Sequence, residues 1–294
     1  MDANIEIIEF TRPVSNCKNL YISGLQTSDL SITQIMSKLY DVFSQYGLVY
    51  EVQVFQGKGS ARQPTDANSY YAFVKFYSYF AAQRAKAGLC RCLKIGSQLC
   101  KVAFATRNKE TETGQTLYVS KCQELANFYL GFNGWSSTIK RMEEDKDAVA
   151  HNPSEAPQIR FFCVVELSFP KQGVTTQGLG AWEEVYSRQD PSSKATAILK
   201  ARKRSHQRAM EHAFSKVLLV VLGNGKVSVE INTTKRDTLT DMQVAILAEE
   251  QVLKVNELNE EPQPEDTDEF HMDGTQDLDD ANLHILQELG DSFS

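Results

Sequence analysis

The chain has 294 residues, with 31 lysines and arginines against 38 acidic residues, and a formal net charge of −7. The excess of acid lies at the C-terminal end, where residues 256–294 contain 13 acidic residues and no lysine or arginine. Residues 1–255 hold the other 25 acidic residues and all 31 basic ones, a balance of about +6. The composition therefore predicts a basic folded part, long enough for two domains, followed by an acidic tail.

The N-terminal residues of the chain and its apolar runs argue against a membrane or secreted protein. The N-terminus lacks the positive start and the apolar core of a signal peptide. The longest aliphatic run, Val217 to Leu222, is much too short to cross a bilayer. We therefore expect a soluble, intracellular protein that does not bind membranes.

The first hundred residues begin with a strand and an amphipathic helix. In residues 19–25 (NLYISGL), Leu20 and Ile22 face one way and Tyr21 the other. Apolar residues then recur at spacings of three and four from Ile32 to Tyr46, which predicts a helix. Ser31 and Gln34 have the spacing of a capping box at its start. A second strand is predicted over residues 49–55.

The next strand, residues 70–76 (YYAFVKF), has two apolar faces. Tyr71, Phe73 and Lys75 lie on one face, whereas Ala72, Val74 and Phe76 lie on the other. Since a sheet needs only one face for its core, the aromatic face is either covered or available to a flat, negatively charged ligand such as single-stranded nucleic acid. A helix capped by Ser78 and a last strand at residues 100–105, with Lys101 on the open face, complete a βαββαβ order.

Residues 20–25 and 69–76 resemble the two short motifs of the RNA recognition motif family, which implies such a domain over residues 15–108. In that family Tyr21, Tyr71 and Phe73 would be the rings that stack on bases. The chain departs from the pattern at Ser69, where the family usually has a basic residue, and Lys75 and Lys101 would supply charge instead. The alternative is an aromatic face that binds protein or is covered by a neighbouring domain.

The second half predicts a small α+β domain with an antiparallel hairpin and a long basic helix. Its first elements are a strand at residues 116–120 and a short helix at 125–130 ended by Gly131. Asn133-Gly134 predicts a turn before Trp135, which we interpret as a core residue. A hairpin follows, with strands at 159–169 and 174–185 around a turn at 170–173. The long helix is expected from about Pro191 to Leu222.

The long helix has the strongest basic pattern in the chain. Lys200, Lys203 or Arg204, and Arg208 fall on nearly one face at steps of three and four residues. An apolar stripe is expected from Leu199, Ala209, Met210, Ala213, Phe214 and Val217. The basic face is either a solvated surface or a phosphate-binding surface, and the aromatic strand in the same chain favours phosphate binding.

Several ordered motifs in residues 116–225 resemble the DNA-binding half of the eukaryotic single-strand-annealing recombination mediators. They are Leu125-Ala-Asn127, Gly131-Phe-Asn-Gly-Trp-Ser136, the hairpin, Gly178-Leu-Gly180, Lys200-Ala-Arg-Lys203 and Leu222-Gly-Asn224. The whole chain is similar to a vertebrate family defined by this fusion with an RNA recognition motif. The resemblance implies an annealing-mediator-like DNA-binding domain over residues 114–236. It also implies that Lys121 and Phe132 contact the strand, whereas Glu211 and His212 replace two basic residues of the family.

The remaining features do not indicate catalysis. The five histidines are scattered, and HExxH, GxSxG and GxxxxGK[ST] motifs are absent from the sequence. The six cysteines include no CxxC pair, so reduced structural thiols are expected, with neither a metal nor another cofactor. A helix is predicted over residues 237–258, and the acidic residues 259–294 are expected to be disordered. Leu283, Leu286 and Leu289 form a short stripe in this tail that could bind a protein partner.

The sequence as a whole predicts a non-enzymatic protein that binds single-stranded or distorted DNA and also RNA, in DNA repair or the response to DNA damage. We expect it in the nucleus, with the nucleolus and a cytoplasmic pool as further sites, and self-association is an additional expectation. One alternative is an RNA-processing factor whose second domain is a scaffold. Another is a protein-interaction adaptor.

Overall fold

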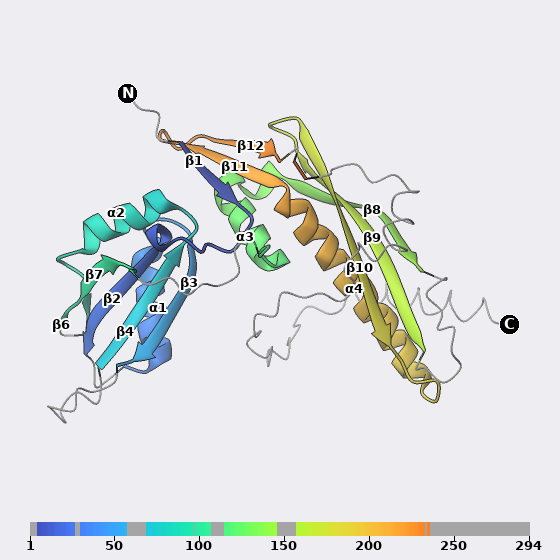
Figure 1. The fold of residues 1–294 in the computed structure, drawn as a ribbon, viewed down its shortest axis with the longest axis horizontal. Helices are drawn as coiled ribbons and strands as arrows, with labels where there is room; N and C mark the ends of the chain where they lie inside the picture. The colour runs from blue at the N-terminus through green and yellow to red at the C-terminus, as the bar shows by residue number, and fades with distance from the viewer. Residues whose placement is uncertain are drawn as a thin grey trace. The chain divides into compact units, whose positions relative to one another are not determined.

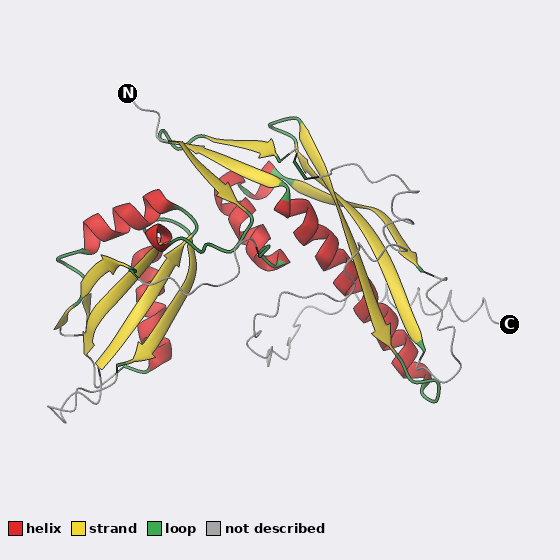
Figure 2. Cartoon of the chain, viewed as in Figure 1, coloured by secondary structure: helices red, strands yellow, loops and turns green. Residues whose placement is uncertain are grey.

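A computed structural model describes residues 5–26, 30–57, 69–96, 98–106, 115–145, 157–232 and 234–235 (Figure 1). The described helices are α1 (Ile32–Ser44), α2 (Tyr79–Leu89), α3 (Val119–Leu130) and α4 (Pro191–Ser215), with short 3-10 helices η1 (Asn16–Lys18) and η2 (Phe132–Gly134). The described strands are β1 (Ile5–Glu9), β2 (Asn19–Gln26), β3 (Val49–Gln56), β4 (Ser69–Phe76), β5 (Lys94–Ile95), β6 (Gln98–Leu99), β7 (Lys101–Phe104), β8 (Ser136–Glu144), β9 (Gln158–Phe169), β10 (Val174–Val185), β11 (Val217–Leu222) and β12 (Val227–Ile231). The chain is therefore α+β with antiparallel sheets (Figure 2).

The first sheet has the strand order β3-β4-β2-β7, and helices α1 and α2 share its core. This is the predicted βαββαβ arrangement, in which the first and third strands are central. The Ser31 side chain accepts a hydrogen bond from the Gln34 backbone N–H, and the Gln34 side chain accepts one from the Ser31 backbone N–H. These two bonds confirm the predicted capping box. Ser78 also caps α2 as predicted, because its side chain accepts from the Ala81 N–H. We call residues 16–106 the first α+β segment.

Strands β8, β9 and β10 form a second sheet, and α4 lies along β9 and β10 (Figure 1). The predicted hairpin strands are present at the expected residues, whereas β8 was not expected. Alternate residues of β9 are buried, from Ile159 to Phe169, and this face packs towards α4. We call residues 115–231 the second α+β segment.

Two glycines of β10 allow α4 to approach the sheet closely. A methyl group placed on Gly178 would lie 2.1 Å from the backbone oxygen of Ala209. On Gly180 it would lie 2.2 Å from the backbone oxygen of Ser205. Both contacts are with helix backbone, so no side-chain movement could relieve them. The Gly178-Leu-Gly180 motif therefore sets the distance between helix and sheet.

The prediction that the long helix continues to Leu222 is wrong. Helix α4 ends at Ser215, and residues 217–222 form strand β11 between β1 and β12. The run VLLVVL is rich in β-branched residues, which pack well on a pleated sheet. Val217 is buried, but as a residue of strand β11 and not as part of an apolar stripe on a helix. Leu199, expected in that stripe, is 64% exposed, so this expectation was also wrong.

The N-terminal strand β1 connects the two segments. It pairs with β11, from Ile5 opposite Leu222 to Glu9 opposite Leu218. The buried Glu6 carboxylate accepts a hydrogen bond from the Ser78 hydroxyl and another from the Tyr79 N–H, both at 2.5 Å. A carboxylate is favourable at this position because it meets the positive end of helix α2.

Residues 116–120 also differ from the prediction. Thr116 forms an isolated bridge with Thr11 in place of the predicted strand, and helix α3 already begins at Val119. The predicted helix at residues 237–258 and the acidic residues 259–294 lie outside the described residues. Within the described part of the chain, none of the helices is long and apolar enough to span a bilayer.

Candidate nucleic-acid interface

Four aromatic side chains lie together on the open face of the first sheet. Tyr21 of β2 is directly opposite Phe73 of β4, with ring centres 5.3 Å apart. Tyr71 lies 6.0 Å from Tyr21 and 6.1 Å from Phe73. All three rings are partly exposed, whereas their neighbours Ala72 and Val74 are fully buried. The structure therefore brings together the three rings predicted from the sequence.

Phe55 is the fourth ring, and the sequence reasoning did not include it. It pairs with Tyr71 across β3 and β4, and the two rings are stacked with centres 5.3 Å apart. It is 40% exposed, which is unusual for a phenylalanine. Side chains alternate between the two faces along β3, which places Phe55 on the same face as Gln53. This alternation is the sequence signal from which Phe55 could have been identified. We call Tyr21, Phe55, Tyr71 and Phe73 the aromatic platform.

Two of the predicted cations lie on the same sheet. Lys75 follows Phe73 on that face of β4, and its ammonium group is 3.9 Å from the Glu51 carboxylate. Lys101 is exposed on β7, opposite Ser23 of β2. Both cations therefore lie at positions from which they could approach the backbone of a strand on the platform.

The two residues carried over from the annealing mediators are on or next to α3. Lys121 is partly exposed and lies 2.7 Å from the Glu124 carboxylate. Phe132, in the 3-10 helix after α3, is 86% exposed. Trp135 packs edge-on against Phe214, and its indole N–H donates to the Asn127 side chain at 2.9 Å. This contact agrees with the interpretation of Trp135 as a structural residue, and it links the two sequence motifs that contain Asn127 and Trp135.

The four predicted basic residues of α4 have different surroundings. Lys200 and Lys203 are exposed. The Arg204 guanidinium lies 5.9 Å from the centre of the Trp182 ring, and the Arg208 side chain, only 18% exposed, approaches Glu211 at 4.0 Å. Lys216, at the end of the same charge run, is fully buried and donates to the Gln177 carbonyl. Lys200 and Lys203 are thus the most accessible cations of this group.

Glu211 has a structural role that explains a carboxylate at a position where the annealing mediators are basic. Its Oε1 accepts from the Val119 N–H at 3.2 Å, at the start of helix α3. The side chain is 14% exposed, and burial raises the pKa of this carboxyl, while Arg208, the Val119 N–H and Arg204 act in the opposite direction. Glu211 therefore joins α4 to α3.

The raised pKa of Glu211 predicts a pH-dependent contribution to stability. The native state holds the Glu211 proton more tightly than the unfolded state, so stability falls as pH rises from about 4.5 through the higher native pKa. Glu211→Gln removes this titration. We expect its free energy of unfolding, relative to the unsubstituted chain, to improve from pH 4 to pH 7 in urea titrations. Glu230 is exposed, so Glu230→Gln is the control that shows how the loss of one exposed carboxylate changes stability with pH. If the difference in free energy of unfolding between Glu211→Gln and the unsubstituted chain did not change with pH, the prediction would be contradicted.

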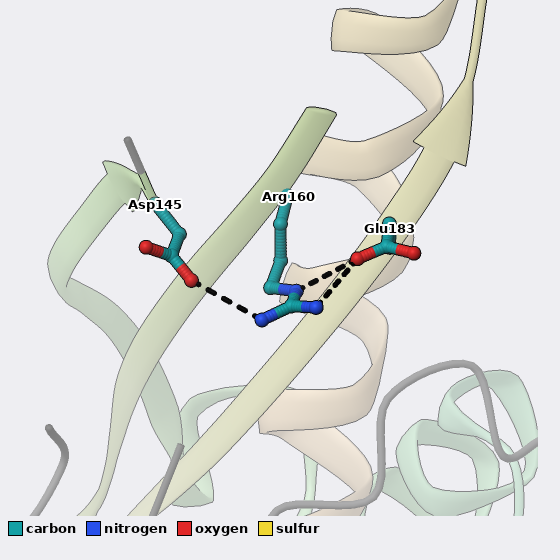
Figure 3. A network of polar contacts seen from close by, with 3 residues as sticks. All are labelled: Asp145, Arg160 and Glu183. Carbon is teal, nitrogen blue, oxygen red and sulfur yellow. Dashed lines mark hydrogen bonds and ion pairs between the residues drawn. The ribbon is translucent and has the colours of Figure 1, made fainter. Parts of the chain in front are cut away.

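The outer face of the second sheet carries charges that are paired with one another. Arg160 of β9 binds Glu183 of β10 through Nε and Nη2, at 2.9 and 2.6 Å, and Asp145 through Nη1 at 3.3 Å (Figure 3). On the same sheet Lys140 pairs with Glu166 at 2.8 Å. These contacts balance the basic residues of this face, so the platform and the cations around it remain the better candidate interface.

The strand order of the first sheet and its exposed rings define a protein that contains an RNA-recognition-motif fold. The chain is 33% identical to RAD52 motif-containing protein 1 of Danio rerio over 289 residues, covering 95% of this chain and 99% of that protein. It is 34% identical to the Gallus gallus protein of the same name, covering 87% and 90%. The Homo sapiens protein is 34% identical over 76% and 80%. The chain belongs to the RAD52 motif-containing protein 1 family.

A protein-family model described as the RDM1 DSRM domain matches residues 117–218, which include α3, the second sheet and α4. Among solved structures, the third RNA recognition motif domain of Mip6 covers 32% of this chain and all of its own, with 18% identity and a TM-score of 0.25. The RNA-binding protein PG1 covers 32% and 99%, with 19% identity and a TM-score of 0.24.

Proposed function

We propose that this protein binds nucleic acid without catalysing a reaction, with single-stranded or distorted DNA and RNA as its ligands. The observation that carries the proposal is the aromatic platform. Its rings come from three adjacent strands and lie 5.3 to 6.1 Å from their neighbours, partly open to solvent. An RNA-recognition-motif sheet uses rings in this arrangement to stack bases. Lys75 and Lys101 are the cations of the same sheet that would contact phosphates.

The membership of the chain in the RAD52 motif-containing protein 1 family supports a role in DNA repair or the response to DNA damage, and with it a location in the nucleus. In this proposal Lys121, Phe132, Lys200, Lys203, Arg204 and Arg208 contribute a second set of contacts. The exposure of Phe132 supports such a role, because an 86% exposed ring contributes little to a core. Arg204, which lies beside Trp182, and Arg208, which approaches Glu211, are less exposed than Lys200 and Lys203 and would add to these contacts.

The proposal is tested by titrating the full chain against labelled single-stranded DNA, duplex DNA and RNA at two salt concentrations. The full chain is required because β1 completes the sheet around β11, so a fragment that begins near residue 112 would lose that strand. We expect single strands to bind more tightly than duplex, with affinity falling as salt rises. RNA binding without DNA binding would favour an RNA-processing factor, and failure to bind any of the three would favour an adaptor.

A further inference from the structure

Tyr50 lies where the first and second α+β segments meet. Between Val49 and Glu51 the register of β3 against β4 shifts, so that Tyr50 is an extra residue in the strand. Such bulges turn a side chain away from the regular alternation of a strand. The Tyr50 side chain is 7% exposed, packs edge-on against Tyr77 and belongs to the same core as Leu117 and Cys122 of the second segment.

Two lysines, one from each segment, lie near this same ring. The Lys75 ammonium group is 5.6 Å from the centre of the Tyr50 ring, and the Lys121 ammonium group is 6.0 Å from it. The two cations are therefore no more than about 12 Å apart, a distance that a few nucleotides of a single strand can span. Lys75 also follows Tyr71 and Phe73 along one face of β4, so it lies at the end of the aromatic platform.

Each lysine has a carboxylate beside it that a phosphate would have to displace. Glu51 lies 3.9 Å from Lys75, and Glu124 lies 2.7 Å from Lys121. The four side chains are between 21% and 33% exposed, and ion pairs this open to solvent contribute little to stability. A strand held on the platform by stacking presents its phosphates at high local concentration, which favours the exchange of partners.

We propose that the aromatic platform and the second segment form one continuous binding track, in which a strand stacked on the platform passes Lys75 and reaches Lys121. This inference rests on the proposed function, and it adds that the two sets of contacts hold the same strand. Tyr50 is then the buried support that keeps both cations at the junction. The track requires both segments, because Lys75 lies on the first segment and Lys121 on the second.

The test compares a thymidine oligonucleotide of about four nucleotides, which covers the platform only, with one of about 20. Lys121→Gln should weaken binding of the long strand about five- to tenfold at roughly 50 mM salt and lower its salt slope by about 0.7. It should leave the short strand unchanged, whereas Lys75→Gln should weaken both. Lys121→Arg should retain affinity, and Glu124→Gln should strengthen binding of the long strand. Exposed Lys38→Gln on α1 is the matched control for lost charge.

The outcomes separate the track from the proposed function. If the long strand binds and Lys121→Gln changes nothing, or weakens both lengths equally, the track is wrong while the proposed function stands. Failure to bind either oligonucleotide would overturn both the track and the proposal that this protein binds single-stranded DNA. Thermal unfolding of each variant shows whether its fold is intact, and a loss of affinity in Lys121→Gln that Lys121→Arg does not share identifies the charge as the cause.

Discussion

Gly180→Ala should destabilise the protein by about 3 kcal/mol or more, which is a large effect for one added methyl group. The new carbon would lie 2.2 Å from the Ser205 backbone oxygen and 2.4 Å from the Ala209 backbone nitrogen. Relief requires α4 to move away from β10, and this movement opens the core around buried residues such as Ala209 and Phe214. Gly178→Ala should have a similar effect, because its new carbon meets the backbone oxygen of Ala209 at 2.1 Å.

The measurement is urea-induced unfolding followed by circular dichroism. Thr175→Ala is the matched control, since Thr175 is exposed on the same strand, and it should change stability by less than about 0.5 kcal/mol. If Gly180→Ala folds with unchanged stability, helix and sheet are not in contact at this point. A variant too unstable to purify is still informative when Thr175→Ala is obtained in normal yield.

Much of the first segment could be predicted because its signals are local. Strand alternation placed Tyr71 and Phe73 on one face, and helical spacing with a capping box placed α1. The Phe55 ring was missed because it comes at the end of a strand whose two faces had not been assigned. Its contact with Tyr71 depends on the register between β3 and β4, which the sequence does not state.

The errors in the second segment arise from contacts between residues distant in sequence. Neither glycine nor proline separates Ser215 from Val217, so the local pattern offers no boundary between α4 and β11. Strand β11 is stabilised by β1, whose residues are more than 200 positions away in the chain. The role of Glu211 depends on a hydrogen bond to Val119, 92 positions earlier. Local periodicity carries no information about such pairs.

Replacing Tyr71 or Phe73 with alanine should weaken binding of single-stranded nucleic acid about 5- to 150-fold in each case. This range corresponds to the roughly 1–3 kcal/mol that one stacked base contributes. The combined effect should not be the product of the two, because the rings contact each other at 6.1 Å and both contact Tyr21. Fluorescence anisotropy with a short labelled strand measures the loss directly.

The controls distinguish loss of stacking from loss of fold. Tyr71→Phe keeps the ring and should bind nearly as well, whereas Phe73→Leu keeps apolar bulk without a flat surface and should bind weakly. Tyr40 on α1 is 42% exposed, and this helix packs on the face of the sheet away from the platform. Tyr40→Ala should therefore leave affinity unchanged. Unchanged affinity in the Tyr71 and Phe73 variants would instead mean that the aromatic face serves another purpose. Protein binding would then be the next hypothesis, because it is unfavourable to leave an exposed group of four rings in water.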